Sequence, residues 1–517
     1  MTPLRIRVAM LAWLWWAVAG GALAQAEAPV APELSRQALQ ADLVVLRDAL
    51  EALHPGLERY TTPAQRKQAY TALADAWSRD QSLRDAHIAL ARFTAFLRCG
   101  HTYANFYNQP EDHQRLLYES GSQRVPFAFR WVDGEMVVTQ NHSGHEDLAP
   151  GARVQAVDGV PTATLLKRLL PLVRGDGHND AQRFALLEVQ GDDEYETFDV
   201  MLPWVLPSIG ERMTFDVVPP RQHSSRRAEV GGLTFQQRRA FRRAPPSRDE
   251  PQWTLRREPD GLAVLTMPTW ALYNSAWDWK AYLQSTFDAL AKAPPSGLVI
   301  DLRGNEGGQD VGDDLLAHLI TEPVTRPVPS REVRYQHVPS NLRQYLDTWD
   351  PGFMDWGTQA RPLGNGRYAL MRPGDVGSDR ITPALPHFAG PVFVLIGARN
   401  SSATFEFAQQ VQATGLATLV GQPTGGNLRG INGGAFFFLR LPRTRIEVDI
   451  PLIKQTHTPL PADAGLIPDI VVALTSQRFA EAGDPELQAV RDALTASSPC
   501  QLTSGCGQEG VTGRLDH

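Results

Sequence analysis

Two adjacent serines, Ser401 and Ser402, stand where the strand pattern of residues 392–396 gives way to a helical pattern at about residues 403–413. A serine at such a sharp passage presents its hydroxyl outward, and the amides that follow, Ala403 first, point their N–H groups at an oxyanion forming there. That arrangement suits a nucleophile. Local sequence alone favours a simpler interpretation, in which the serines cap the helix, because serine is common at that position.

A glycine-rich loop at residues 301–308 (DLRGNEGG) follows another predicted strand. Glycine lets the main chain approach a ligand closely, so the N–H of Gly307 or Gly308 can face a developing negative charge. The loop lacks both the G-x-G-x-x-G spacing and the G-K-[ST] ending of nucleotide-binding loops. Glycine-rich turns of this kind are common. The loop therefore indicates an oxyanion site only in combination with a nucleophile.

A hydroxyl nucleophile needs a base, which is either a desolvated lysine or a histidine. The chain has five lysines, at positions 67, 167, 280, 292 and 454. No lysine lies between Lys292 and Lys454, so the whole stretch around Ser402 contains no amine base. Lys454 is the one nearby lysine, and a lone lysine at a strand end is usually a solvated surface charge.

Histidines offer the alternative base. His101 lies just past a predicted helix end, beside Gly100, from where its ring can reach a neighbouring domain. His54 at a helix stop and His457 near a strand end are expected to be structural. An H-x-x-H pair at positions 142 and 145 lies in a polar loop beside Glu146, and so short a motif does not favour a zinc site.

Four ordered motifs together resemble the tail-specific, or C-terminal-processing, family of serine peptidases. They lie at residues 297–308, 400–403, 420–426 (VGQPTGG) and 465–469 (GLIPD). The resemblance covers about residues 260–475 and extends to the segments upstream. It implies an α/β core of the crotonase and caseinolytic protease (ClpP) type that hydrolyses peptides or proteins with no metal and no cofactor.

The same resemblance implies a role for each site residue. Ser402 becomes the nucleophile instead of a helix cap, with the N–H of Ala403 and that of Gly307 or Gly308 as the oxyanion donors.

The base distinguishes the branches of the family. The processing branch carries a catalytic lysine where this chain has Asn427, so the chain is closer to the tricorn-like and retinoid-binding-protein-like branch, in which His101 matches the base. The acid that orients it is expected shortly before the GLIPD ending, where Asp463 is nearest, with Glu406, one turn beyond the nucleophile, as the alternative. The branch has a serine before its histidine, whereas this chain has Gly100.

Periodicity supplies the elements that must position these residues. Leucines at 39, 43, 46, 50 and 53 form a helical stripe, whereas alternating apolar residues after position 125 predict strands, with a hairpin at Asp133-Gly134. We expect a signal peptide at 1–24, a helical domain at 27–118, a PDZ-like β-rich module at 119–219, an arginine- and proline-rich linker at 220–258, the α/β core at 259–475, with an unassigned insertion at about 323–391, and a tail at 476–517.

The leader and the composition limit the function. Arg5 and Arg7 precede an apolar run that ends in a small-x-small cleavage pattern and is shorter than the ~20 residues of a membrane span, so the mature protein is expected to be periplasmic or secreted, without a stable span. Removing the two arginines lowers the formal charge from −7 to −9. A nucleic-acid partner is therefore not expected. Cys500 and Cys506 can close a small loop, and Cys99 is expected to be a buried thiol.

These features predict an exported serine-type peptidase that acts on peptides or proteins. The alternative is an inactive peptidase scaffold that binds peptides or an apolar ligand. Acyl-CoA chemistry on the same core is disfavoured, since that cofactor is not expected outside the cytoplasm.

Overall fold

The computed structural model describes residues 33–325, 329–371, 380–481 and 483–497. The predicted leader at 1–24 and the pair Cys500 and Cys506 lie outside the described residues. Cys99 is buried and free, as expected. Within the described ranges, no helix is long and apolar enough to cross a membrane.

A six-stranded sheet forms the centre of the α/β core. Its order is β22 (Ile470–Val471), β19 (Thr418–Gly421), β18 (Val392–Ile396), β11 (Leu298–Asp301), β10 (Ala263–Thr266) and β9 (Thr254–Arg257). All neighbours are parallel except β9, which runs antiparallel to β10. Parallel strands end at one edge, so the loops after β11 and β18 meet there.

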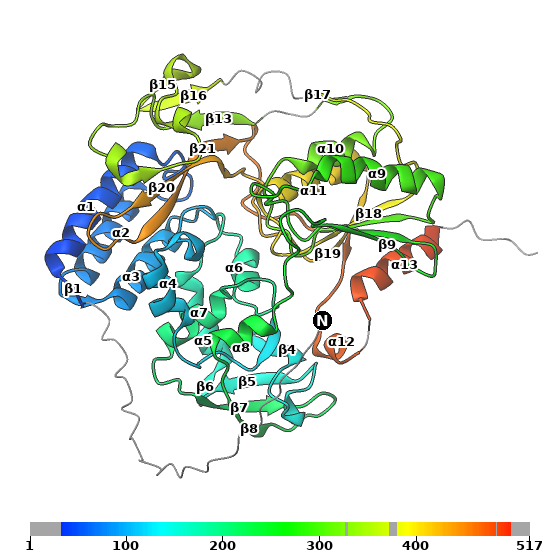
Figure 1. Ribbon diagram of the computed structural model, residues 1–517, viewed down its shortest axis with the longest axis horizontal. Coiled ribbons are helices and arrows are strands. Elements are labelled where there is room, and N and C mark those ends of the chain that lie inside the picture. Colours follow the sequence, from blue (N-terminus) through cyan, green and yellow to red (C-terminus); the bar gives the residue numbers. More distant parts are fainter. Residues whose placement is uncertain (1–32, 326–328, 372–379, 482, 498–517) are drawn as a thin grey trace, which may run out of the picture.

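Alternation along the strands explains why both faces of this sheet are covered. Leu298 and Ile300 face one apolar cluster, whereas Val299 faces another. The first cluster is closed by α9 (Trp279–Lys292), α10 (Val311–Ala317) and α11 (Ser402–Thr414), and the second by α13 (Pro485–Ser497) (Figure 1). The segment predicted as a tail therefore contributes α13 to the folded core, whereas the short α12 (Ser476–Ala480) lies against β4 (Glu135–Asn141) of the β-rich module.

The amino-terminal part is helical, as the leucine stripe predicts. Its elements are β1 (Glu33–Leu34), α1 (Arg36–Leu53), α2 (Pro63–Ala76), β2 (Gln81–Ser82), α3 (Leu83–Phe96) and α4 (Glu111–Gln114). All five leucines of the stripe are buried. Thr62 forms a capping box with Gln65 at the start of α2. Helix α3 ends shortly before His101 and so carries it to the domain edge.

The β-rich module contains an antiparallel sheet with the order β3 (Phe127–Val132), β4 (Glu135–Asn141), β5 (Arg153–Val157), β7 (Arg212–Val218) and β8 (Arg226–Gly231). The short β6 (Val160–Pro161) pairs with β5, and the helices are α5 (Thr162–Leu169), α6 (Ala181–Leu186), α7 (Thr197–Val205) and α8 (Phe235–Ala240). The hairpin at Asp133-Gly134 is present, with both residues at positive φ.

The predicted linker at 220–258 is wrong in part, because it contains the edge strands β8 and β9. In β8, Ala228 and Val230 are buried while Arg226 and Arg227 point outward, an alternation that the density of arginines concealed.

A third sheet changes the assignment of the strands after residue 430. Its order is β14 (Leu346–Asp347), β20 (Asn432–Arg440), β21 (Glu447–Thr456), β13 (Ser330–Val333), β16 (Arg367–Leu370) and β15 (Ala360–Gly364), and a separate pair joins β12 (Val324–Thr325) to β17 (Arg380–Ile381). Strands β20 and β21, predicted in the α/β core, thus pair with the insertion at 323–391.

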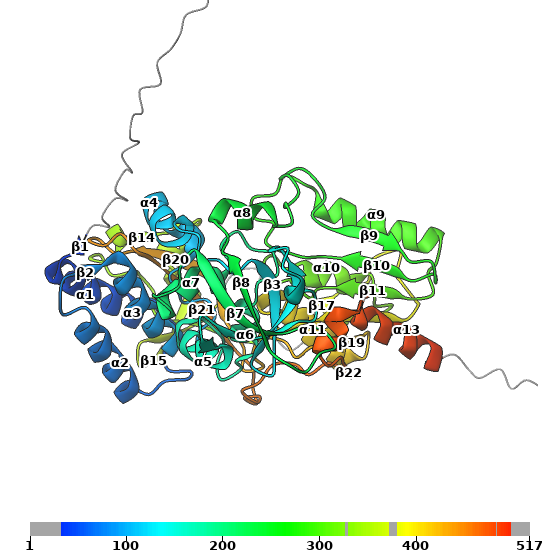
Figure 2. The same cartoon turned by 90° about the horizontal axis from the view of Figure 1, so that it is seen from below.

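This third sheet packs on the amino-terminal helices (Figures 1 and 2). Asp42 of α1 accepts hydrogen bonds from the amides of Arg443 and Thr444 in the β20–β21 turn, at 2.9 and 2.7 Å. A strand pattern predicts that a segment is extended, but it does not identify the sheet that the segment joins.

Candidate active site

Ser402 is the first residue of α11 and has a φ of +52°, in the left-handed region that non-glycine residues rarely adopt. Ser401 occupies the N-cap position, but its side chain caps nothing. Its hydroxyl instead donates to the carbonyl of Glu306 at 3.1 Å and accepts from the side-chain amide of Gln182 at 3.3 Å. The helix-cap interpretation is therefore wrong for Ser401, and among the described hydrogen bonds none uses the hydroxyl of Ser402.

The glycine loop lies directly against this serine. A Cβ added to Gly307 would lie 2.9 Å from the Cβ of Ser402 and 3.0 Å from the amide nitrogen of Ala403. The N–H of Gly307 donates to the side chain of Asn305 at 2.9 Å, so it is engaged. The hydrogen bonds of the described residues leave the N–H groups of Gly308 and Ala403 free, the latter in the first turn of α11 where such donors lack helical partners.

Asn400 holds the surrounding loops together. The sequence motifs did not predict this role. Its side-chain amide donates to the carbonyls of Leu302 and Asn305, and its backbone carbonyl accepts from Gly425 and Gly426 at 3.0 and 2.9 Å. Asn400 is fully buried. The one feature of the sequence that could have indicated this role is that Asn400 is a polar residue between a buried strand and the start of a helix.

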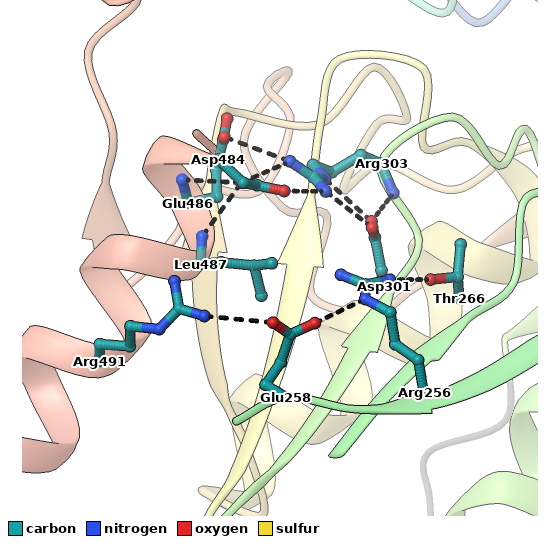
Figure 3. A network of polar contacts seen from close by, with 9 residues as sticks. All are labelled: Arg256, Glu258, Thr266, Asp301, Arg303, Asp484, Glu486, Leu487 and Arg491. Carbon is teal, nitrogen blue, oxygen red and sulfur yellow. Dashed lines mark hydrogen bonds and ion pairs between the residues drawn. The ribbon is translucent and has the colours of Figure 1, made fainter. Parts of the chain in front are cut away.

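A charged network fixes the far end of the glycine loop. Arg303 contacts the carboxylates of Asp301 and Asp484 at 2.7 Å each and that of Glu486 at 3.2 Å. Figure 3 shows this guanidinium between the end of β11 and the start of α13. The carboxy-terminal helix thereby helps to position the loop that carries Gly307.

His101 lies against β20, with its ring centroid 5.6 Å from that of Phe436. Burial lowers the pKa of His101, the negative charges of Asp176 and Glu306 act in the opposite direction, and Arg174 adds to the lowering. Its Nδ1 is buried without a hydrogen-bond partner. Among the residues that the structure describes, no hydrogen bond joins His101 to Ser402. The two are linked indirectly, because the charge of Glu306 acts on His101 and the next residue, Gly307, lies against Ser402.

An ion cluster connects the β-rich module to the α/β core beside the site. Arg399 contacts Asp193 and Glu306, both at 2.6 Å, and Arg174 contacts the other oxygen of Glu306 at 2.7 Å. Burial alone would raise the pKa of Glu306, but the two guanidiniums outweigh it and lower this pKa to about 2. The cluster borders a cavity of about 230 Å³ that Tyr103 and residues of the β-rich module also line.

The acid expected to orient His101 is paired elsewhere. Asp463 contacts Nδ1 of His178 at 2.6 Å and accepts from the backbone of His178 at 3.0 Å and from the side chain of Asn427 at 2.7 Å. A contact between Asp463 and His101 is thus absent from the described hydrogen bonds. Glu406 lies on α11 one turn beyond Ser402 and is partly exposed.

The other candidate residues, Lys454, His54 and the H-x-x-H pair, make contacts that do not involve the candidate site. Lys454 pairs with Glu332 across β21 and β13 at 3.3 Å. Nε2 of His54 lies 2.9 Å from the hydroxyl of Thr102, so this buried histidine is structural, as expected. The H-x-x-H segment at 142–145 belongs to no metal-binding group, since the described part of the chain contains no cluster of three or more ligands.

Comparisons with known proteins identify the fold. Residues 261–448 match the model of peptidase family S41. The chain is similar to mature CPAF complexed with lactacystin, with a TM-score of 0.59 and 16% identity over 89% of this chain and 97% of that one. A CPAF mutant gives a TM-score of 0.57 and 15% identity over 89% and 95%. No curated protein sequence matches. The chain therefore has the fold of the S41 serine peptidases, with mixed α/β sheets.

Proposed function

We propose that the protein is a serine-type peptidase in which Ser402 is the nucleophile. The observation that carries the proposal is the free Ser402 hydroxyl, held at a strained strand-to-helix turn against a glycine loop with a free amide. The S41 fold supports the same reaction class. The core is proposed to be of the crotonase and ClpP type, and the β-rich module to be PDZ-like, receiving an extended peptide at a sheet edge.

In the proposed reaction Ser402 attacks the peptide carbonyl carbon while His101 accepts the hydroxyl proton. The carbonyl oxygen becomes an oxyanion that takes hydrogen bonds from the amides of Ala403 and Gly308. His101 then protonates the leaving amine, and water hydrolyses the acyl-enzyme. Hydrogen bonds between catalytic groups are often long before substrate binds, so His101 is expected to approach Ser402 in the complex.

The choice of a histidine base assigns the chain to the tricorn-like branch. Asn427, at the position of the processing branch's lysine, is buried and bonded to Asp463. The leader supports a periplasmic or secreted location, where such an enzyme would meet peptides or proteins.

A fluorophosphonate probe with mass spectrometry tests the nucleophile. The probe should label Ser402, and Ser402→Ala should abolish both labelling and turnover of a peptide library. Ser401→Ala is the matched control, because it removes the neighbouring hydroxyl and should retain labelling. His101→Ala should reduce the rate by about 10²–10⁴-fold, the usual contribution of a general base. Full turnover in either the Ser402 or the His101 variant would contradict the assignment.

A second candidate is an inactive scaffold that binds peptides or an apolar ligand. The lack of a hydrogen bond between His101 and Ser402 in the described residues favours it. Saturable binding of library peptides, together with no labelling at Ser402, would identify this function.

A further inference from the structure

Gly100, directly before His101, leaves room for a buried carboxylate. Its N–H donates to Oδ1 of Asp176 at 2.8 Å. A Cβ on Gly100 would lie only 2.7 Å from Oδ2 of the same residue. The space that a side chain at position 100 would occupy is therefore filled by Asp176, which comes from the loop after α5 in the β-rich module.

Asp176 is an unusual acid because half of its carboxylate is unsatisfied. The residue is 3% exposed, and its Oδ2 is buried and has no hydrogen-bond partner among the described residues. The same part of the chain offers no partner to the buried Nδ1 of His101. Buried polar atoms rarely remain unpaired unless a function or a conformational change uses them. Asp176 lies against Gly100, the residue before His101, and its charge acts on the His101 ring, so the two unpaired atoms belong to neighbouring groups.

The other charges around His101 do not replace Asp176. Glu306 also acts on the imidazole, but Arg174 and Arg399 already neutralise it. Asp463 is bound to a different histidine, as described above. Three further titratable groups neighbour Asp176, namely Cys99, Tyr60 and Arg183. Cys99 and Tyr60 are neutral when protonated and Arg183 is positively charged, so none of them supplies a negative charge for the imidazolium.

We propose that Asp176, and not Asp463, is the carboxylate that balances the positive charge on His101 when this base has taken the proton of Ser402. Asp176 is thus a positioning residue that acts through His101. The inference rests on the proposed function. It also explains why glycine stands where the tricorn-like branch has a serine, since any side chain at Gly100 would displace the carboxylate.

The test compares Asp176→Asn, which removes the charge but keeps an acceptor for the Gly100 amide, with Asp463→Asn, the same change at the other acid. Asp176→Asn should lower kcat about 10- to 100-fold with little change in KM, because the imidazolium loses its counter-charge. The carboxylate raises the pKa of His101, so its loss should move the acid limb of the kcat/KM profile to lower pH. Asp463→Asn should leave that limb in place.

A measurement without turnover separates this proposal from the function on which it rests. In a Ser402→Ala background, NMR titration of the His101 ring should show a lower pKa after Asp176→Asn. Asp463→Asn should instead change the ring signals of His178 and leave the titration of His101 unmoved. If Asp176→Asn does not fold, Asp176→Ser removes the same charge with a smaller side chain, and Asp176→Glu should preserve the wild-type titration.

The outcomes are distinct. Fluorophosphonate labelling at Ser402 with an unchanged His101 titration in the uncharged Asp176 variants would overturn the role of Asp176 alone. A shift of the titration caused by Asp463→Asn would return the role to Asp463. Absence of labelling in the wild-type protein would overturn the peptidase assignment, whereas the NMR result would still report whether the two groups are coupled.

Discussion

Removal of Arg399 should destabilise the protein and damage the candidate site together. Arg399→Met keeps an unbranched apolar stem but deletes the guanidinium and its contacts of 2.6 Å with Asp193 and with Glu306. The guanidinium is 8% exposed, and its partners are 34% and 28% exposed. Arg174 still balances part of the charge on Glu306 in the variant.

The magnitude follows from these exposures. Breaking a fully buried ion pair by removing one partner costs about 3–5 kcal/mol. Water can reach both carboxylates here, so the free energy of unfolding should fall by about 3 kcal/mol, the lower end of that range. Because the carbonyl of Glu306 accepts the Ser401 hydroxyl, the glycine loop should also shift, and labelling of Ser402 should slow by about tenfold or more.

Urea unfolding followed by tryptophan fluorescence measures the stability, and fluorophosphonate labelling measures the site. Arg212→Met is the matched control, because the Arg212–Glu229 pair has a similar distance of 2.8 Å but is 70% and 55% exposed. Its loss should cost less than about 1 kcal/mol. A double variant that adds Glu306→Gln to Arg399→Met should be destabilised by less than the sum of the single changes. Equal effects of the Arg399 and Arg212 variants would refute the reasoning.

Three further outcomes are expected. Lys454→Met should retain fluorophosphonate labelling, and its loss would identify a lysine base. Gly308→Ala should abolish labelling because its Cβ would lie 2.2 Å from the backbone of Trp270, whereas Gly304→Ala in the same loop meets nothing within 4 Å and should be tolerated. Burial lowers the pKa of His87 to about 3, so the unfolded chain binds the extra proton below pH 6.5 and acid destabilises the fold. With His87→Phe, the stability lost between pH 6.5 and pH 5 should therefore be smaller by about 1.6 kcal/mol, measured by urea unfolding at both pH values.

The arrangement of motifs indicates the proposed nucleophile, whereas local rules favour a helix cap. Serine at a helix start is ordinarily a cap, and that rule fails here because Ser401 turns its hydroxyl to the neighbouring loop and Ser402 adopts a positive φ. Both conformations depend on the contact with residues 305–307, about 95 positions earlier. The residues next to the serines do not indicate a contact with a loop so far away in the sequence. An ordered set of motifs indicates it indirectly, because the loop and the serines are two of those motifs.

The contacts of the two candidate acids could not be predicted for the same reason. Asp463 is the acid nearest to the GLIPD ending, yet its partner His178 lies 285 positions earlier in a loop of the β-rich module. Asp176 carries no sequence signal beyond a position between two glycines, Gly175 and Gly177. Only the structure shows that its carboxylate fills the space beside Gly100.

The loop at residues 174–178 accounts for the way the separate parts form one site. Arg174 binds Glu306 and donates to the carbonyl of Gly100, Asp176 accepts from the amide of Gly100, and His178 binds Asp463. One loop of the β-rich module thus contacts the helical domain before His101, the glycine loop beside Ser402 and the segment before GLIPD. A movement of the module on peptide binding would move all three together. In the proposed peptidase, such coupling would let a peptide bound in the module bring His101 to Ser402 through the contacts of Asp176 and Arg174.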